Sequence, residues 1–347
     1  MAKAIYGPWH DLDFDSDGKR VGYLHLPVTT SRSGYGNLMV PIIVIRRGPG
    51  PVALLMGGNH GDEFEGQVAM SRIATLLRPE HVSGGVIVMP VANLPAAMAS
   101  NRVSPVDSGN LNATFPGRID GTPTSQIAHF IETELLPRVA LWVDIHSGGT
   151  SLIYAPTAAI HQSEDPALDR ATLDLLRAFG APSNVVFKLQ HEYAASTAAQ
   201  RHGVPYIYGE FGGAATIDPA GLQIAQDGTL RVLARLGVLR ADSGLVPEAR
   251  EAGPLLETAT GVDFRDTRRN YAFTPVTGVF ERAVALGERV MAGGLVGHVH
   301  PVELPLSKPI PVIFSMGGVV IALRHLARVE PGDCLAQIAI DRGWGIT

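Results

Sequence analysis

The stretch VALLMGGNHGDEFEG (residues 52–66) runs from an apolar segment directly into two glycines, a histidine and three acids. An apolar run without alternating polar residues predicts a central strand that is covered on both faces. In open sheets with helices on both faces, ligands bind beyond the carboxyl ends of the strands. The charged residues 57–66 therefore mark a candidate site at the end of a buried strand.

Strands and helices alternate on both sides of this stretch. From residue 37 to about residue 239, short β-rich runs alternate with longer runs that carry apolar residues at helical spacing. This pattern is typical of an α/β domain with helices on both faces of the sheet. Asp218 and Pro219 suit the N-cap and the first position of the closing helix. We predict strands at 39–45, 52–56, 86–91, 140–145, 151–154 and 205–208, and helices at 67–77, 125–136 and 220–239.

The composition changes beyond the closing helix. Residues 241–274 are rich in charge, glycine and proline, which predicts a linker with some local structure. Segments 277–300 and 311–338 each contain a Gly-Val run and then a turn, and they resemble the hairpins of a lipoyl/biotinyl-like barrel. We therefore expect a catalytic domain at 1–250. A linker and a small all-β barrel-like domain with a structural or oligomerising role are expected at 251–347.

The overall composition is typical of a globular protein and favours small molecules as its partners. The chain has 347 residues, of which 46% are hydrophobic, and a formal net charge of −5 without a basic run. These features argue against a surface for nucleic acid or anionic lipid. The single cysteine, Cys334, excludes an internal disulfide and fits a reducing compartment. The start of the sequence has no apolar segment of signal-peptide length, and proline, serine and glycine interrupt the longest apolar region, 310–323. We therefore expect a soluble, cytoplasmic protein.

His60 and Glu63 are spaced as two ligands of one Zn²⁺. Histidine nitrogen and carboxylate oxygen are common zinc ligands. The spacing alone is weak, because about half a His-x-x-Glu match is expected by chance. The sequence contains three further pairs: His129 with Glu132, His161 with Glu164, and His300 with Glu303. For these we expect ordinary structural roles, with His129 and Glu132 on the solvated face of a helix. His60 differs, since it follows a predicted buried strand and is flanked by glycines that allow close backbone approach.

A third ligand is needed, because a catalytic zinc site typically uses three protein ligands and leaves one position for water. The best candidate is His146 in LWVDIHSGG, since residues 141–145 again have the pattern of a buried strand that ends in a polar residue and glycines. If the two strands run parallel, His60 and His146 lie at the same edge of one sheet. A satisfied core histidine is the alternative for His146. Asp144 could orient a ligand or pair with an arginine.

A hydrolase also needs an acid/base group. The run VPYIYGEFGG repeats the arrangement of a β-like segment, a polar residue and glycines, with Glu210 as the polar residue. Glu65 and Glu192 compete for the role. Glu65 is close in sequence to the metal pair, and Glu192 begins a helical segment, where an acid suits the helix dipole. We therefore favour Glu210 as the group that takes a proton from the attacking water and passes it to the leaving amine.

The motifs GGNHGDEFEG, DIHSGG and GEFGG, in this order, resemble those of the succinylglutamate desuccinylase/aspartoacylase family, relatives of the zinc carboxypeptidases. The resemblance covers about residues 40–240. It implies an α/β fold with a carboxypeptidase-like mixed sheet and helices on both faces. It also implies one Zn²⁺ per chain held by His60, Glu63 and His146, with Glu210 as the catalytic acid/base.

Two further segments can be compared with the family residue by residue. NLPAAMASNR resembles the segment whose final arginine, here Arg102, polarises the scissile carbonyl. NLNATFPG, residues 110–117, keeps the family's Asn112 at the substrate site but has Ala113 where the family has an arginine that binds a substrate carboxylate. Either Arg118, just downstream, supplies this cation, or the substrate does not present a free α-carboxylate in the usual way.

These features predict a zinc-dependent hydrolase that removes the acyl group from a small N-acylated amino acid. Within the family, the motifs look closest to the branch that deacetylates Nα-acetyl-L-2,4-diaminobutyrate in ectoine breakdown. A metallocarboxypeptidase for short peptides and a catalytically silent metal or metabolite binder in a homo-oligomer are the alternatives. Co²⁺ or Mn²⁺ could occupy the same ligands. Ser147 is not expected to act as a nucleophile, since no Gly-x-Ser-x-Gly elbow surrounds it.

Overall fold

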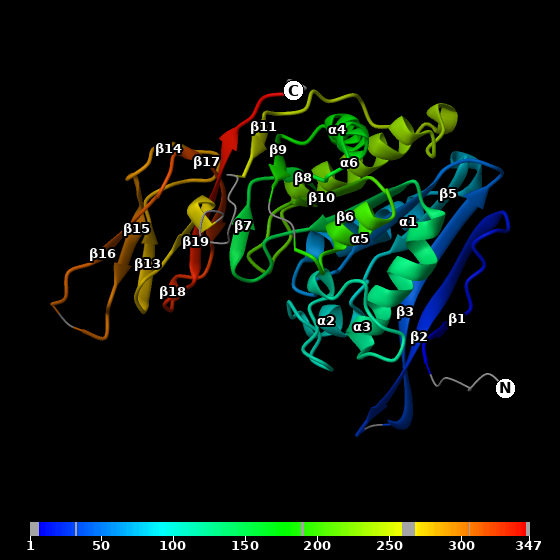
Figure 1. The fold of residues 1–347 in the computed structure, drawn as a ribbon, viewed down its shortest axis with the longest axis horizontal. Coiled ribbons are helices and arrows are strands. Elements are labelled where there is room, and N and C mark those ends of the chain that lie inside the picture. The colour runs from blue at the N-terminus through cyan, green and yellow to red at the C-terminus, as the bar shows by residue number, and fades with distance from the viewer. Residues whose placement is uncertain (1–6, 32, 189–190, 259–267, 305, 345–347) are drawn as a thin grey trace.

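The chain folds into a mixed α/β unit that is joined to a C-terminal group of strands (Figure 1). The computed structural model describes residues 7–31, 33–188, 191–258, 268–304 and 306–344. The strands of the α/β unit are β1 (Trp9–His10), β2 (Gly18–Thr30), β3 (Ser33–Arg47), β4 (Val52–Gly57), β5 (Gly84–Met89), β6 (Leu141–His146), β7 (Leu152–Tyr154), β8 (Thr157–His161), β9 (Ser183–Phe187) and β10 (Tyr206–Glu210). Its helices are α1 (Phe64–Leu76), α2 (Leu94–Ala99), α3 (Pro123–Phe130), α4 (Pro166–Phe179), α5 (Ala195–Arg201) and α6 (Pro219–Leu236).

The C-terminal group contributes strands to two sheets. These strands are β11 (Leu255–Glu257), β12 (Tyr271–Phe273), β13 (Gly278–Arg282), β14 (Arg289–Val290), β15 (Leu295–His300), β16 (Ile310–Ile313), β17 (Gly318–Arg324), β18 (Arg328–Val329) and β19 (Cys334–Asp341). A large mixed sheet has the order β1-β2-β3-β5-β4-β6-β10-β8-β9-β11-β19-β17-β14, so it continues from the α/β unit into the C-terminal group. A four-stranded antiparallel sheet has the order β16-β15-β13-β18.

The centre of the large sheet is parallel, which meets the condition that the sequence set for His60 and His146 to share one edge. Strands β5, β4, β6 and β10 run in the same direction, with Gly57 opposite Ile145 and Glu210 opposite His146. Strand β6 is buried at every position, and β4 is buried at all but its first residue. The apolar runs therefore form covered central strands, and their carboxyl ends meet at one edge.

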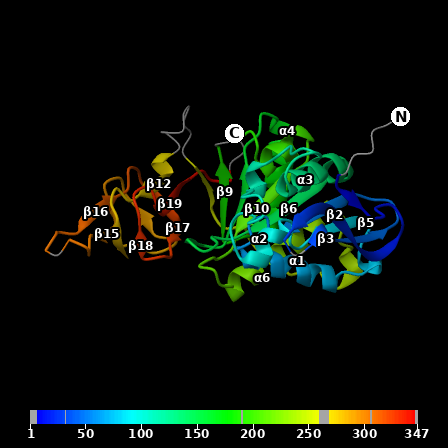
Figure 2. The same ribbon diagram turned by 90° about the horizontal axis from the view of Figure 1, so that it is seen from below.

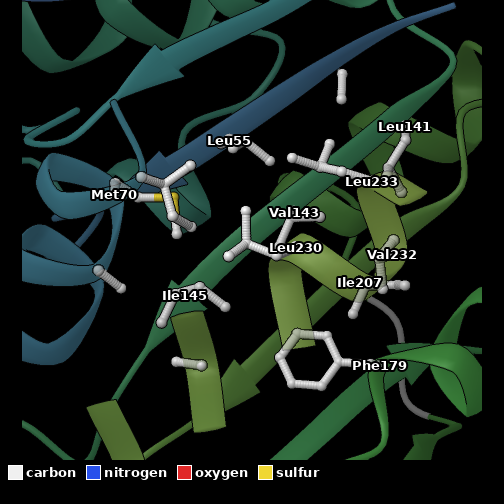
Figure 3. Packing of buried hydrophobic residues seen from close by; sticks show 14 of the residues in the cluster. Leu55, Met70, Leu141, Val143, Ile145, Phe179, Ile207, Leu230, Val232 and Leu233 are labelled. Carbon is white, nitrogen blue, oxygen red and sulfur yellow. The ribbon is translucent and has the colours of Figure 1, made fainter. Parts of the chain in front are cut away.

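The two faces of these strands have separate cores. On one face, Val143, Ile145 and Ile207 pack in a cluster that includes residues of α1, α4 and α6 (Figure 3). On the other face, Trp142 and Tyr206 pack in a cluster that includes residues of α3 and α5. Because side chains alternate along a strand, the second face also carries Asp144, His146, Tyr208 and Glu210. Helices thus cover both faces, and one face leads directly to the candidate site.

The predicted helices and their boundaries agree in part with the structure. Helix α6 begins at Pro219, and both carboxylate oxygens of Asp218 accept backbone N–H groups of its first turn, as expected for an N-cap. The predicted helix 125–136 is instead α3 followed by a π-helical segment, Ile131–Leu135. Within the described residues, no helix combines the length and the apolar character needed to span a membrane.

Gly66 allows helix α1 to pack directly against strand β6. A Cβ atom at this position would overlap the carbonyl oxygen of Ile145, next to His146. We expect Gly66→Ala to lower the free energy of unfolding by about 1–3 kcal/mol, because overpacking a close contact forces the backbone to shift. Urea denaturation measures this change. Gly34→Ala is the matched control, since nothing lies within 4 Å of a Cβ atom there. Equal stability of the two variants would contradict the close packing.

The C-terminal strands form two antiparallel layers around a shared core. Phe280, Val296 and Val299 from one sheet lie in the same apolar cluster as Leu323 and Leu335 from the other. The expected small all-β region is therefore present, and its likeness to a lipoyl/biotinyl barrel stays a prediction. Figure 2 shows these strands at the opposite end of the molecule from β2 and β3.

The linker predicted at 241–274 is attached to the large sheet. Its strand β11 pairs with β9 on one side and with β19 on the other. Residues 259–267 of this prediction lie outside the described residues. A second connection is made by β7, which pairs with β17. The sheet therefore passes between the two halves of the chain without an interruption at residue 250, and the predicted domain boundary stays a prediction.

Candidate metal centre and acid/base site

His60, Glu63 and His146 converge at the carboxyl edge of the parallel strands. His60 lies just beyond β4, Glu63 is the N-cap residue of α1, and His146 ends β6. The two carboxylate oxygens of Glu63 lie 2.7 Å from His60 Nδ1 and 2.7 Å from His146 Nδ1. All three side chains are buried, and one ligand atom from each lies within 4.8 Å of the others. The three residues thus form a group that could hold a metal ion.

The outer nitrogen of each histidine is also held in place. His60 Nε2 lies 3.0 Å from Asn110 Oδ1, and His146 Nε2 lies 3.0 Å from Asp144 Oδ2. When Nε2 donates to such an oxygen, Nδ1 of a neutral ring is left as the ligand atom. Ring orientation and donor type therefore fit a divalent ion such as Zn²⁺.

Asp144 is the hub that supports His146. Its Oδ2 atom, in a fully buried carboxylate, lies 3.0 Å from three donors: His146 Nε2, Asn59 Nδ2 and the hydroxyl of Tyr206. Of the two roles considered for Asp144, the structure shows the orienting one. Since three donors fix the carboxylate, the His146 ring has little freedom to turn.

The charges at this centre are strongly coupled. Burial alone would raise the pKa of Glu63, but the charges of His60 and His146 lower this pKa far below its usual range. Burial opposes a charge on His146, yet Asp144 and Glu63 raise the pKa of its imidazole well above the ordinary value. The carboxylates thus attract positive charge to the place where the histidine Nδ1 atoms meet.

Glu210 stands beside this centre with one free oxygen. It pairs with His146 across the parallel strands β10 and β6. Among the described residues, none provides a hydrogen-bond partner for its buried Oε2 atom. Burial, and next the negative charge of Glu63, raises the pKa of Glu210 to about 8. A carboxyl group with a raised pKa and an unpaired oxygen is suited to accept and donate a proton.

The two competing acids have different surroundings. Glu65 is fully buried, and its Oε1 atom accepts backbone N–H groups of Gly213 and Asp218 at 3.3 and 3.1 Å. Glu65 therefore holds the loop that follows Glu210. Glu192 is exposed at the surface. Neither residue shares the position of Glu210 opposite His146.

Arg102 reaches the centre from the loop after α2. Its Nη1 atom lies 3.0 Å from Glu63 Oε1, and 57% of its side chain is exposed. The loop is held next to the first motif, because Gly61 donates its N–H to the carbonyl of Asn101 at 2.9 Å. The exposed guanidinium therefore has N–H donors beyond the one that contacts Glu63.

The side chains of the two predicted substrate-binding residues bond to groups outside the metal centre. Asn112 Oδ1 accepts the backbone N–H of Ala195 at 3.3 Å, which fixes the start of α5. Arg118 is exposed and makes two hydrogen bonds of 2.9 Å to Asp120. Within the described part of the chain, neither side chain has a hydrogen bond or ion pair with the metal-centre residues. Their roles in binding substrate stay predictions.

One of the additional His-x-x-Glu pairs is placed differently from the expectation. Glu132 was expected on a solvated helix face, but it is buried with 6% exposure. Glu132 forms a bidentate ion pair with Arg201 of helix α5. Arg201 Nε donates to Oε1 at 2.9 Å, and Nη2 donates to Oε2 at 2.8 Å. His300 pairs with Glu281 on the neighbouring strand at 2.8 Å. These contacts are structural.

Three supporting residues were not singled out from the sequence: Asn59, Asn110 and Tyr206. Asn59 and Asn110 lie inside the motifs GGNHGDEFEG and NLNATFPG, so their proximity to the ligands was a usable signal. Tyr206 lies four residues before Glu210 and therefore on the same face of β10. Alternation along the strand could have identified it.

The family assignment follows from comparison with known proteins. Residues 49–236 match the model of the succinylglutamate desuccinylase/aspartoacylase catalytic domain. The chain belongs to this family. The N-alpha-acetyl-L-2,4-diaminobutyric acid deacetylase of Halomonas elongata is 37% identical over 329 residues, which span 94% of this chain and 93% of that protein.

Solved structures of the succinylglutamate desuccinylase/aspartoacylase family share the whole fold. The product-bound structure of the ectoine utilization protein EutE (DoeB) from Ruegeria pomeroyi is 34% identical, with a TM-score of 0.90, covering 96% of this chain and 98% of that chain. The succinylglutamatedesuccinylase/aspartoacylase from Rhodobacter sphaeroides is 35% identical, with a TM-score of 0.88, covering 96% and 99% of the respective chains. The named enzymes among these relatives are deacylating hydrolases.

Proposed function

We propose that this protein is a zinc-dependent hydrolase that removes the acyl group from a small N-acylated amino acid. One observation carries the proposal: the group His60, Glu63 and His146 lies beside Glu210, whose buried oxygen has no partner among the described residues. A divalent ion held by the three ligands would act as a Lewis acid toward the scissile carbonyl and the attacking water. The identity to a deacetylase over nearly the whole chain supports the same reaction class.

The chain's own residues divide the remaining work. Glu210 takes the proton from the attacking water and delivers it to the amine that leaves. Arg102 directs free N–H donors to the carbonyl oxygen, where negative charge develops; loss of one such donor typically costs about 3–4 kcal/mol in the transition state. Asp144 keeps His146 in its ligating orientation.

The substrate that we propose is Nα-acetyl-L-2,4-diaminobutyrate. The deacetylase from Halomonas elongata, as named, acts on this compound. The position of Ala113 supports the choice against a carboxypeptidase, because alanine cannot bind a peptide's terminal carboxylate in the bidentate way of arginine. Arg118 also makes two side-chain hydrogen bonds to Asp120. A silent metal binder would have no need for the unpaired Oε2 atom of Glu210.

A panel of substrates tests the reaction. Zinc-loaded protein is incubated with Nα-acetyl-L-2,4-diaminobutyrate, Nα-acetyl-L-aspartate, N2-succinyl-L-glutamate and an unblocked dipeptide, and release of the free amine is measured. We expect the highest kcat/KM for Nα-acetyl-L-2,4-diaminobutyrate. Hydrolysis of the dipeptide alone would favour the peptidase, and no hydrolysis of any compound would remove the proposed function.

The proposal includes the context of the enzyme. We propose a catalytic domain at residues 1–250 and a linker with a lipoyl/biotinyl-like β domain at 251–347. One Zn²⁺ per chain, a cytoplasmic location and a homo-oligomer belong to the same proposal. The family match over residues 49–236 supports the first of these assignments.

A further inference from the structure

Three tyrosines and a glutamine from both halves of the chain lie near Glu210. They are Tyr154 at the end of β7, Tyr208 on β10, Tyr271 on β12 and Gln337 on β19, and we name them the tyrosine cluster. The hydroxyl of Tyr154 donates to Gln337 Oε1 at 2.9 Å, and Gln337 Nε2 donates to the hydroxyl oxygen of Tyr271 at 3.0 Å. Tyr271 and Gln337 are direct partners on antiparallel strands. The C-terminal strands therefore set the position of a side chain in the α/β unit.

The tyrosine cluster adjoins the acid/base group on two sides. Tyr208 lies two residues before Glu210 on the same strand face, and its ring centre is 6.3 Å from that of His146. Tyr154 donates its backbone N–H to the carbonyl of Gly212, two residues after Glu210, at 2.9 Å. The three tyrosine side chains and Glu210 each keep partial exposure, although Gln337 is buried. The tyrosine cluster thus flanks Glu210 along β10 and along the loop that follows Glu210.

The three phenols stay protonated and neutral. Burial, and next the negative charge of Glu210, raises the pKa of Tyr154 and that of Tyr208 well above the ordinary value. Burial raises the pKa of Tyr271 to about 12. Glu210 is the acidic group that acts on all three phenols, and Cys334 acts on Tyr154 and Tyr271 as well. In the part of the chain that the structure describes, no Lys or Arg side chain hydrogen-bonds to the tyrosine cluster.

The hydrogen bonds also set the direction of the Tyr154 hydroxyl. Because its proton points to Gln337 Oε1, the lone pairs of its oxygen remain available for a donor. Aromatic rings add a negative face that attracts cations. Acceptor oxygens and ring faces suit an ammonium group, whereas a substrate carboxylate would find no cation in the tyrosine cluster.

We propose that the tyrosine cluster binds a short cationic side chain of the substrate, with the ammonium group accepted by the oxygens of Tyr154 and Tyr208. The inference rests on the proposed deacylase function, because the amine released at Glu210 and the side chain share one α-carbon. In 2,4-diaminobutyrate the two nitrogens are at most about 5 Å apart. The Cα atoms of residues two apart on a strand, such as Tyr208 and Glu210, are about 6.6 Å apart. The span of the diamine is therefore of the same order as the spacing of these two residues along the strand.

Binding of the reaction products tests this assignment without turnover. L-2,4-diaminobutyrate and its neutral analogue L-homoserine are titrated into zinc-loaded protein by calorimetry. We expect the wild type to bind L-2,4-diaminobutyrate at least about tenfold more tightly than L-homoserine. Tyr154→Phe and Gln337→Met should each reduce this ratio of affinities to about threefold or less. The first variant removes an acceptor oxygen, and the second removes the hydrogen bond that holds the Tyr154 hydroxyl. Tyr35→Phe is the control, because Tyr35 is 96% exposed.

Two results would overturn the inference. The first is that the wild type binds the diamine and L-homoserine with equal affinity. The second is that the folded variants keep the wild-type ratio of these two affinities. Circular dichroism confirms folding, and Tyr271→Phe, which removes only one oxygen, replaces Gln337→Met if the latter unfolds. Either result leaves the deacylase function intact as long as the wild type hydrolyses any N-acetyl amino acid. Failure of the whole substrate panel would instead remove the proposed function.

Discussion

The Glu210→Gln variant is expected to keep its metal ion and to lose about 10³-fold in kcat, because general acid/base catalysis typically contributes 10²–10⁴-fold. Glutamine has nearly the same shape as glutamate but cannot take the proton of the attacking water. The measurement combines metal analysis with amine release from the preferred N-acyl substrate. A silent metal binder would show no turnover to lose, so the variant also separates these two functions.

Glu192→Gln provides the matched control for this experiment. Glu192 is one of the two acids that compete with Glu210 in the sequence, and it is exposed in the structure. Its replacement should change kcat by less than about threefold, as is usual for a surface substitution. A large loss with Glu192→Gln together with a small loss with Glu210→Gln would reverse the assignment of the acid/base group.

The His146→Ala variant is expected to lose the bound metal ion and at least about 10³-fold in kcat. Removing one of three ligands weakens binding far more than the 10–100-fold loss that is typical when an outer partner of a ligand is changed. Zinc content after dialysis and the rate of amine release are measured on the same sample. Chelation of the wild type should abolish activity in the same way, and added Zn²⁺ should restore it.

His129→Ala is the control for the metal ligand. His129 has the same spacing to a glutamate as His60 but lies on helix α3. This variant should keep its full metal content. Retention of stoichiometric zinc by His146→Ala would contradict the ligand set, because the remaining pair, His60 and Glu63, supplies only two side chains.

The position of the site was predictable from the sequence because strand burial and glycine placement are local signals. The β4 segment is apolar throughout, and residues 141–145 of β6 are apolar except for Asp144; each segment leads into a histidine and glycines. Parallel pairing of β4, β6 and β10 then brings their carboxyl ends together. Once the strands were recognised, their direction determined which residues meet.

Several elements did not follow from local patterns. Strand β2 contains Gly22 and Pro27, which interrupt a strand pattern. On one side of β2 the short strand β1 pairs only with Leu24 and His25, so that edge is open at Pro27. A proline is tolerated at such an edge because it has no N–H to donate. The helical spacing through 125–136 does not reveal the change to a π-helix at Ile131. The backbone hydrogen-bond pattern and the neighbouring strands decide these two features. The spacing of apolar residues along the sequence reveals neither.

Contacts between distant segments were the hardest to predict. Glu132 is buried because Arg201 from another helix meets it. Tyr271 and Gln337 meet Tyr154 because β12 pairs with β19 and β17 pairs with β7. No motif in the C-terminal sequence indicates which side chain of this region faces the α/β unit. Such contacts depend on strand register across more than one sheet junction.

Strand β7 makes it difficult to separate the α/β unit from the C-terminal strands or to exchange either one with a relative. It pairs with β17 on one side, and on the other it bonds to the loop after Glu210 through Gly212 and Ala214. A shortened chain ending before β11 would leave β7 and β9 with open edges, which favour aggregation. A chimera between relatives would therefore have to inherit β17 and β19 together with the loops they support.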